Sequence, residues 1–143
     1  MVKEFKLLGF QFDKILVEKD PEFKGKISNP SSDINIKSVE KHNISLIKED
    51  SIKITFSFTL KFGDLGKLEM FGNLVILLDE DSKKKVLEDW KTKKMPEDIR
   101  LTILNLILQR SSLKALHLEE EVGLPLHIQL PKLQIQSKKE DKS

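Results

Sequence analysis

The chain has 143 residues and no cysteine, so it fits one domain with a core of ordinary size and excludes disulfides and thiol chemistry. Charged residues make up 34% of it, yet the formal net charge is only +2 and both signs are interspersed, which argues against a dedicated nucleic-acid binder. No apolar stretch is long enough for a signal peptide or a membrane span, so we expect a soluble, cytoplasmic protein.

The first predicted strand covers residues 8–17. Its apolar residues change parity between Phe12 and Ile15. Such a change within one strand indicates a β-bulge or a bend, here near Asp13. Pro21 ends the strand because proline has no backbone N–H to donate to a sheet.

The middle of the chain predicts three further strands of an antiparallel sheet. A strand with an irregular apolar pattern lies within residues 34–47. Residues 51–62 alternate between apolar and polar without a fault, which is typical of a strand with one buried face. A turn with two glycines over 63–66 then leads into a return strand over 67–78.

The return strand has an apolar end on the face that should point away from the core. Lys67 and Glu69 begin that face, and Phe71, Val75 and Leu77 continue it. Either a loop of the same chain covers these three apolar side chains, or they contact another polypeptide. The pattern leaves both alternatives open.

Two helices complete the predicted fold. A short helix over 82–91 places Trp90 on its apolar, core-facing side, and its lysines at 83–85 are interleaved with acids, which indicates a solvated face. A long helix over 96–122 begins with a proline, which suits the first helical position. Gly123 is the expected left-handed cap at its end.

Residues 99–108 of the long helix are apolar almost all the way round. One interpretation is a fully buried core helix. The other is that further subunits cover part of it, because a chain of this length has little fold with which to wrap a helix on every side. The segment 124–131 contains two prolines and cannot continue the helix, and its leucines are expected to be exposed.

No part of the sequence has the pattern of a catalytic or metal site. It contains no G-x-S-x-G turn, no P-loop and no G-x-G-x-x-G motif. His42, His117 and His127 have no converging ligands nearby in the sequence, so solvent-exposed histidines are the better interpretation of all three. We therefore expect no enzyme activity, no metal and no cofactor, and we look for function in the surfaces.

Three features resemble, in order and spacing, the SecB family of protein-export chaperones and its SecB-like relatives outside classical export. They are the segment 10–15, the proline that starts the long helix, and the Gly-Leu-Pro-x-x-Ile-x-Leu-Pro motif over 123–131. The resemblance extends over 8–135. It implies an α+β fold: a four-stranded antiparallel sheet with one long C-terminal helix packed on one face, followed by an extended Leu/Pro crossover. It also implies one SecB-like domain over 1–136, whereas the charged composition of 137–143 predicts a disordered tail.

The resemblance further implies a function. Members of the family form dimers that pair through their long helices into tetramers, and they hold unfolded or nascent polypeptides in hydrophobic grooves without nucleotide. We therefore predict an ATP-independent holdase that forms a homo-oligomer, a dimer of dimers, with protein export as one setting. Two alternatives stay open: an interaction module that protects one partner, such as an aggregation-prone antitoxin, and a ligand carrier or enzyme with a pocket between sheet and helix. The chain departs from the family in leaving little room for a second helix after the crossover.

The candidate site residues fall into three groups. By the resemblance, the residues that line the client groove are Leu124, Pro125, Leu126, Ile128, Leu130 and Pro131. The strand pattern alone adds Phe71, Val75 and Leu77. The helix residues expected at the oligomer interface are Ile99, Ile103, Leu106 and Leu113. The alternative for the crossover leucines is that they fill the core of their own subunit.

Overall fold

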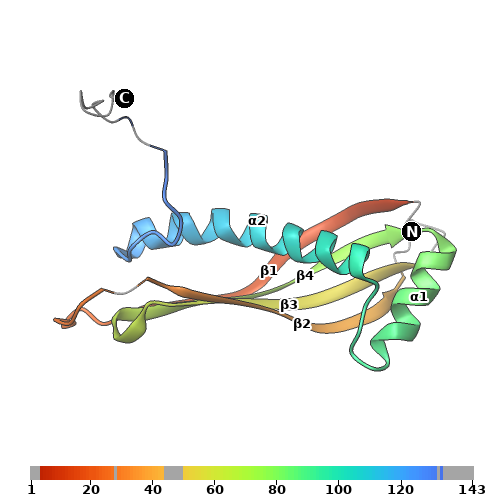
Figure 1. Cartoon of the computed structure of the whole chain (residues 1–143), viewed down its shortest axis with the longest axis horizontal. Helices are drawn as coiled ribbons and strands as arrows, with labels where there is room; N and C mark the ends of the chain where they lie inside the picture. Colours follow the sequence, from red (N-terminus) through yellow and green to blue (C-terminus); the bar gives the residue numbers. More distant parts are fainter. Residues whose placement is uncertain (1–3, 28, 44–49, 132, 134–143) are drawn as a thin grey trace, which may run out of the picture.

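The computed structural model describes residues 4–27, 29–43, 50–131 and 133, and it confirms the predicted fold class. The elements in chain order are β1 (Phe5–Lys19), β2 (Ser31–His42), β3 (Ser51–Lys61), the 3₁₀ turn η1 (Gly63–Leu65), β4 (Gly66–Leu78), α1 (Glu80–Trp90) and α2 (Glu97–Val122). The four strands form one antiparallel sheet in the order β1-β4-β3-β2 (Figure 1). The tail expected over 137–143 lies outside the described residues.

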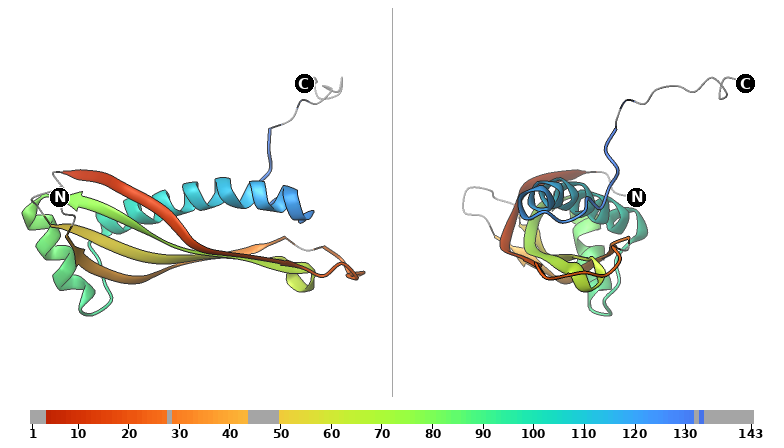
Figure 2. Two further views of the ribbon diagram at one scale, coloured as in Figure 1. Left: turned by 180° about the vertical axis from the view of Figure 1, so that it is seen from behind. Right: turned by 90° about the vertical axis from the view of Figure 1, so that its left-hand side faces the viewer.

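The helices lie on one side and at one end of the sheet. Figure 2 shows α2 running along one face of the sheet, while α1 stands across the end near the N-terminus. Among the described elements, no helix covers the opposite face. This arrangement leaves β1 and β2 as the two edge strands, one on each side of α2.

Bulges in both edge strands keep their apolar side chains on the face toward α2. The β1–β4 register shifts between Leu7 and Gly9 and again between Phe12 and Lys14. These shifts pair the apolar residues of β1 with the core-facing residues of β4, and the residues so placed are Phe5, Leu7, Phe10, Phe12, Ile15 and Val17. The bulge expected near Asp13 is confirmed. A shift after Ile36 does the same for Val39, which explains the irregular pattern of β2.

The core lies between the sheet and α2. The alternating residues of β3 are almost fully buried there, and these are Ile52, Ile54, Phe56, Phe58 and Leu60. Gly72 of β4 allows the Phe56 ring to lie against the sheet, since a Cβ at this position would stand 2.9 Å from the Phe56 Cζ and 2.3 Å from the Gln11 carbonyl oxygen. The Phe56 ring packs 5.2 Å from Phe10 and 6.2 Å from Phe12, measured between ring centroids.

Side-chain and backbone caps define the two helices. Asp79 caps α1 by accepting from the Ser82 backbone N–H at 3.1 Å. Lys83, predicted to be solvated, is instead buried, with its Nζ 3.0 Å from the carboxylate of the exposed Glu80. The expected cap of α2 is confirmed, because Gly123 has a φ of 84° and its N–H donates to the Glu119 carbonyl at 2.9 Å.

Residues at every fourth position of α2 face the core. They are Ile99, Ile103, Ile107, Ser111, Ala115 and Glu119. With 3.6 residues per turn, such a row drifts around the helix by about 40° at each step. This drift lets the helix keep contact with a twisted sheet along its whole length. The other sides of the all-round apolar segment 99–108 are therefore left outside the core.

Candidate interaction surface

The crossover segment, which we define as residues 124–131, is anchored at its start. Leu124 is only 5% exposed and belongs to the same core cluster as Ala115 of α2 and Phe58 of β3. This corrects the expectation that Leu124 lines a groove for a client, because it fills the core of its own subunit. Pro125, which follows, is half-buried.

A buried pair of side chains then fixes the middle of the crossover segment to α2. The His127 Nδ1 lies 2.7 Å from Glu119 Oε2, and the His127 backbone N–H donates to Glu119 Oε1 at 3.2 Å. The side chains of Glu119 and His127 are 0% and 8% exposed. The His127 ring also packs edge-on against Phe58, with 6.4 Å between centroids. The expectation of a solvent-exposed His127 is therefore wrong.

The residues on either side of His127 point into solvent. Leu126, Ile128 and Leu130 are 42%, 41% and 53% exposed. The buried side chain of His127 fixes the backbone at this bend, and the apolar side chains on either side of it stay exposed. Pro131 is exposed as well. The crossover segment thus presents the predicted leucines on a backbone that is held in place.

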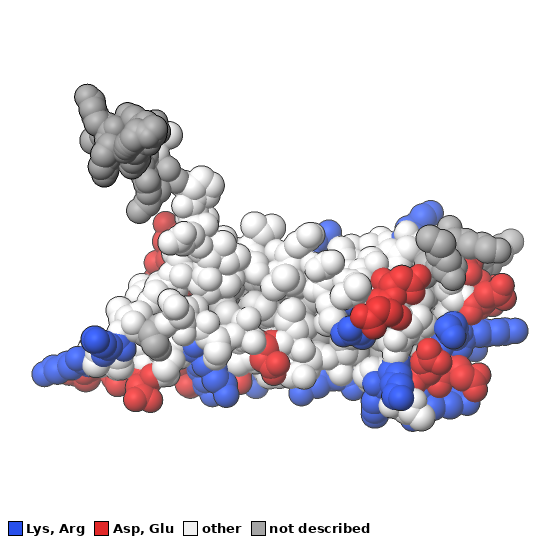
Figure 3. Space-filling view, viewed as in Figure 1, with Lys and Arg blue, Asp and Glu red and all other residues white. Residues whose placement is uncertain are grey.

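Further exposed leucines lie on α2. Leu101, Leu108 and Leu113 are 48%, 42% and 69% exposed. Figure 3 shows an area with few charged residues over α2 and the crossover segment, while charges gather along the lower edge of the sheet and around α1. Together with the exposed Leu101, Leu108 and Leu113, this area of low charge is a candidate contact surface.

The residues expected at the oligomer interface divide into two kinds. Ile99 and Ile103 are 2% and 0% exposed in the core of their own subunit, so they offer almost no surface to a second copy, and the expectation for them is corrected. Leu106 is half-buried, and Leu113 is freely exposed. Sequence reasoning did not single out Leu101 and Leu108, which are exposed. Both lie in the segment 99–108, for which an interface with further subunits was one interpretation.

The apolar residues of β4 do not join this surface. Phe71, Val75 and Leu77 lie on the face of the sheet opposite α2, where Phe71 pairs with Ser57 and Val75 with Lys53. Leu77 is only 7% exposed, so it is corrected from a client contact to a buried residue. Phe71 and Val75 are partly exposed, and Lys14 Nζ lies 5.7 Å from the Phe71 ring centroid. The structure therefore separates this group from the crossover segment by the thickness of the sheet.

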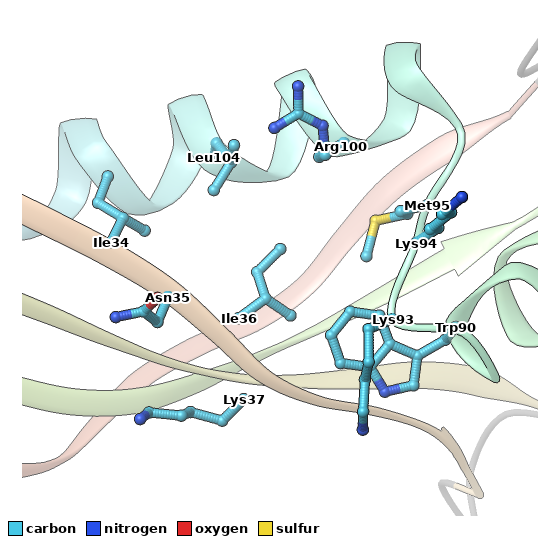
Figure 4. Close-up of a pocket in the computed structure, with 10 residues that line it drawn as sticks. All are labelled: Ile34, Asn35, Ile36, Lys37, Trp90, Lys93, Lys94, Met95, Arg100 and Leu104. Atoms are coloured by element: carbon cyan, nitrogen blue, oxygen red, sulfur yellow. The ribbon is translucent and has the colours of Figure 1, made fainter.

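A groove that sequence reasoning missed opens between the edge strand β2 and the first turns of α2 (Figure 4). Its volume is about 490 Å³. The apolar residues that line it are Ile34, Ile36, Trp90, Met95 and Leu104, and the cationic ones are Lys37, Lys93, Lys94 and Arg100. Trp90, predicted as core, packs partly against the core and partly lines this groove. The only signal in the sequence was that part of β2 is apolar on one face. This pattern does not tell which helix lies beside the strand.

The chemistry of these surfaces suits binding. The lining of the groove contains no carboxylate, histidine, serine or threonine. Within the part of the chain that the structure describes, no three His, Cys, Asp or Glu residues gather in a way that could hold a metal ion. In the same part, no helix is long and apolar enough to cross a membrane.

Comparison with known proteins gives one structural likeness. No protein-family model and no curated protein sequence matches the chain. Among solved structures, the chain is similar to the Mycobacterium tuberculosis SecB-like chaperone Rv1957, solved in complex with a ChAD peptide from the Rv1956 HigA1 antitoxin. The likeness covers 93% of each chain, with 10% sequence identity and a TM-score of 0.49. At this level, the likeness concerns the fold alone.

Proposed function

We propose that this protein binds unfolded or nascent polypeptides without nucleotide, as a cytoplasmic holdase. The observation that carries the proposal is the crossover segment, where Leu126, Ile128 and Leu130 are exposed while the side chain of His127, between the first two, is buried. Apolar side chains held outward on an anchored backbone are ready to bury the apolar side chains of a client. Leucine and isoleucine accept varied partners, which suits a promiscuous surface.

The size of this surface indicates that one subunit alone binds weakly. Covering a leucine that is already half-buried contributes on the order of 1 kcal/mol, so the three exposed side chains of the crossover segment contribute about 3 kcal/mol. A dissociation constant of 1 mM already needs roughly 4 kcal/mol. A useful holdase therefore needs several such surfaces that engage one client together.

We therefore also propose that copies of the chain associate through α2, with a dimer of dimers as the assembly. The exposed Leu101 and Leu108 lie one helical repeat of seven residues apart, so they share one side of α2. Leu113 lies further round the helix.

The proposal is tested by suppression of aggregation. The purified protein, without ATP, is mixed at near-equimolar ratio with several chemically denatured clients, and light scattering is followed. Suppression is expected for the parent and loss of suppression for Leu126→Asp/Ile128→Asp. The matched control is Ile27→Asp/Asn29→Asp, which adds the same charge at exposed positions before β2. Equal suppression by both double variants would contradict a role of the crossover segment.

A second candidate function is an interaction module for one partner, such as an antitoxin. The groove beside β2 favours it, because a lining with several cations and no acid discriminates between partners by charge. The same set of clients separates the two functions. Protection of one client among many, with a fixed stoichiometry, supports the dedicated module, and protection of most clients supports the holdase.

A further inference from the structure

We propose that the groove between β2 and α2 binds an extended, acidic segment of a partner polypeptide, which adds as a strand to the free edge of β2. The inference rests on the proposed function in one respect, since it takes the partner to be a polypeptide. It adds to that function a second binding site, away from the crossover segment, that prefers acidic ligands.

The edge of β2 supplies the main-chain contacts. Among the described residues, β2 is paired on one side only, with β3, so its other side has backbone groups available for pairing. The regular part of this edge is 31–36, because the register shift after Ile36 interrupts the ladder. A strand added along 31–36 would satisfy these backbone groups, as in other cases of strand addition.

The side chains beside that edge select the apolar residues of the ligand. Ile34 and Ile36 pair with Phe58 and Phe56, so they project toward α2, and Leu104 faces them across the groove in Figure 4. Because alternate side chains of a strand point the same way, every second residue of an added strand would enter the groove. The volume of about 490 Å³ lies within the usual range for binding pockets.

The cations that line the groove select the charge of the ligand. Lys37, Lys93, Lys94 and Arg100 line it, and no acidic residue does. The Arg100 guanidinium is paired with the Glu97 carboxylate at 2.8 Å, while Lys93 Nζ lies 5.0 Å from the Trp90 ring centroid. The three lysines form no ion pair with any described residue. Carboxylates next to the apolar residues of a bound strand would complement them.

These features favour a polypeptide over a nucleic acid. Lys93 and Lys94 lie on the link between α1 and α2, while Lys37 lies on β2 and Arg100 on α2. The other residues of the lining are apolar except Asn35. A nucleic acid needs a longer track of cations along its phosphates, and it has no backbone groups that could extend a sheet.

The chain carries its own probe for this site. Trp90 is the only tryptophan and lines the groove, so its fluorescence reports on occupancy. The ligands for the titration are synthetic peptides in which valines alternate with serines, with paired glutamates at both ends or paired lysines in their place. A third peptide has the acidic sequence with its edge-facing amides N-methylated, which removes the donors needed for strand pairing.

At low salt, the acidic peptide is expected to bind about fivefold or more tightly than the lysine peptide, with a difference that shrinks as salt screens the charges. Lys93→Glu/Lys94→Glu should abolish or reverse the preference. The matched control Lys84→Glu/Lys85→Glu changes the same charge at exposed positions of α1 outside the groove and should preserve it. The N-methylated peptide should bind several-fold more weakly than its parent.

Equal binding of the acidic and basic peptides, equal effects of the two double variants, or displacement of the acidic peptide by an equimolar single-stranded oligonucleotide would each overturn the inference. Failure here is distinguishable from failure of the holdase proposal. Suppression of aggregation that depends on Leu126 and Ile128, without charge-selective peptide binding, removes the groove assignment alone. Charge-selective peptide binding without any suppression keeps the groove and removes the holdase.

Discussion

Replacing His127 with alanine is expected to destabilise the protein by about 1 to 3 kcal/mol, the range for leaving a buried polar group without its hydrogen-bond partner. The variant leaves the Glu119 carboxylate, 0% exposed, without the ring nitrogen that lies 2.7 Å away. It also removes the contact of the ring with Phe58. Since small domains are stable by roughly 5 to 15 kcal/mol, this loss is a large part of the total.

The double variant Glu119→Leu/His127→Leu tests whether the stability comes from the polar contact between the two side chains or from the volume that they fill. It removes both polar partners, so the main remaining cost is the His127 backbone N–H, which loses its acceptor, at about 1 to 2 kcal/mol. The double variant is thus expected to be more stable than His127→Ala. Urea unfolding followed by circular dichroism at fixed protein concentration measures both, and a double-mutant cycle gives the coupling.

Hydrogen exchange of the crossover segment adds a local readout. In His127→Ala, faster amide exchange is expected in residues 124–131. The amides of β3 that exchange by local opening should change little. A cost of His127→Ala below about 1 kcal/mol, or a double variant as unstable as the sum of its single variants, would refute the claim that the Glu119–His127 pair anchors this segment.

The remaining predictions concern the core, a cap and the assembly. Gly72→Ala should cost about 1 to 3 kcal/mol in urea unfolding, because its Cβ would lie 2.3 Å from the Gln11 carbonyl oxygen and 2.9 Å from the Phe56 ring; an unchanged midpoint would contradict this packing. Asp79→Ala should cost about 1 kcal/mol through loss of the α1 cap, measured in the same way, and Asp79→Asn should restore most of it. Leu101→Asp/Leu108→Asp should lower the mass measured by light scattering, and an unchanged mass would exclude this side of α2 as the interface.

Local patterns in the sequence were enough for the elements and several of their details. The strict alternation over 51–62 gave a strand with one buried face, and the parity change near Asp13 gave a bulge. Gly123 gave the end of α2. These features are readable because side chains alternate with a period of two in a strand and because a glycine readily adopts the left-handed conformation at a helix end.

Which surfaces are buried was decided only by the tertiary structure. The all-round apolar segment 99–108 did not tell which of its sides meets the sheet, and the structure buries Ile99 and Ile103 while it exposes Leu101 and Leu108. Likewise, Phe71 and the crossover segment were assigned to one surface, but the sheet lies between them. Helical and strand periodicity give the relative direction of side chains, whereas burial depends on what packs against them.

The two features that carry the proposals arise from contacts between distant parts of the chain. His127 is buried because α2 ends beside β3, which brings Glu119 and Phe58 to the same ring. The groove exists because the strand order puts β2 at the edge, beside the start of α2. The sequence by itself therefore determined the elements, their boundaries within a few residues and the apolar character of the crossover segment. Its anchoring and the groove were decided only by folding, because burial is a property of packed neighbours rather than of a residue alone.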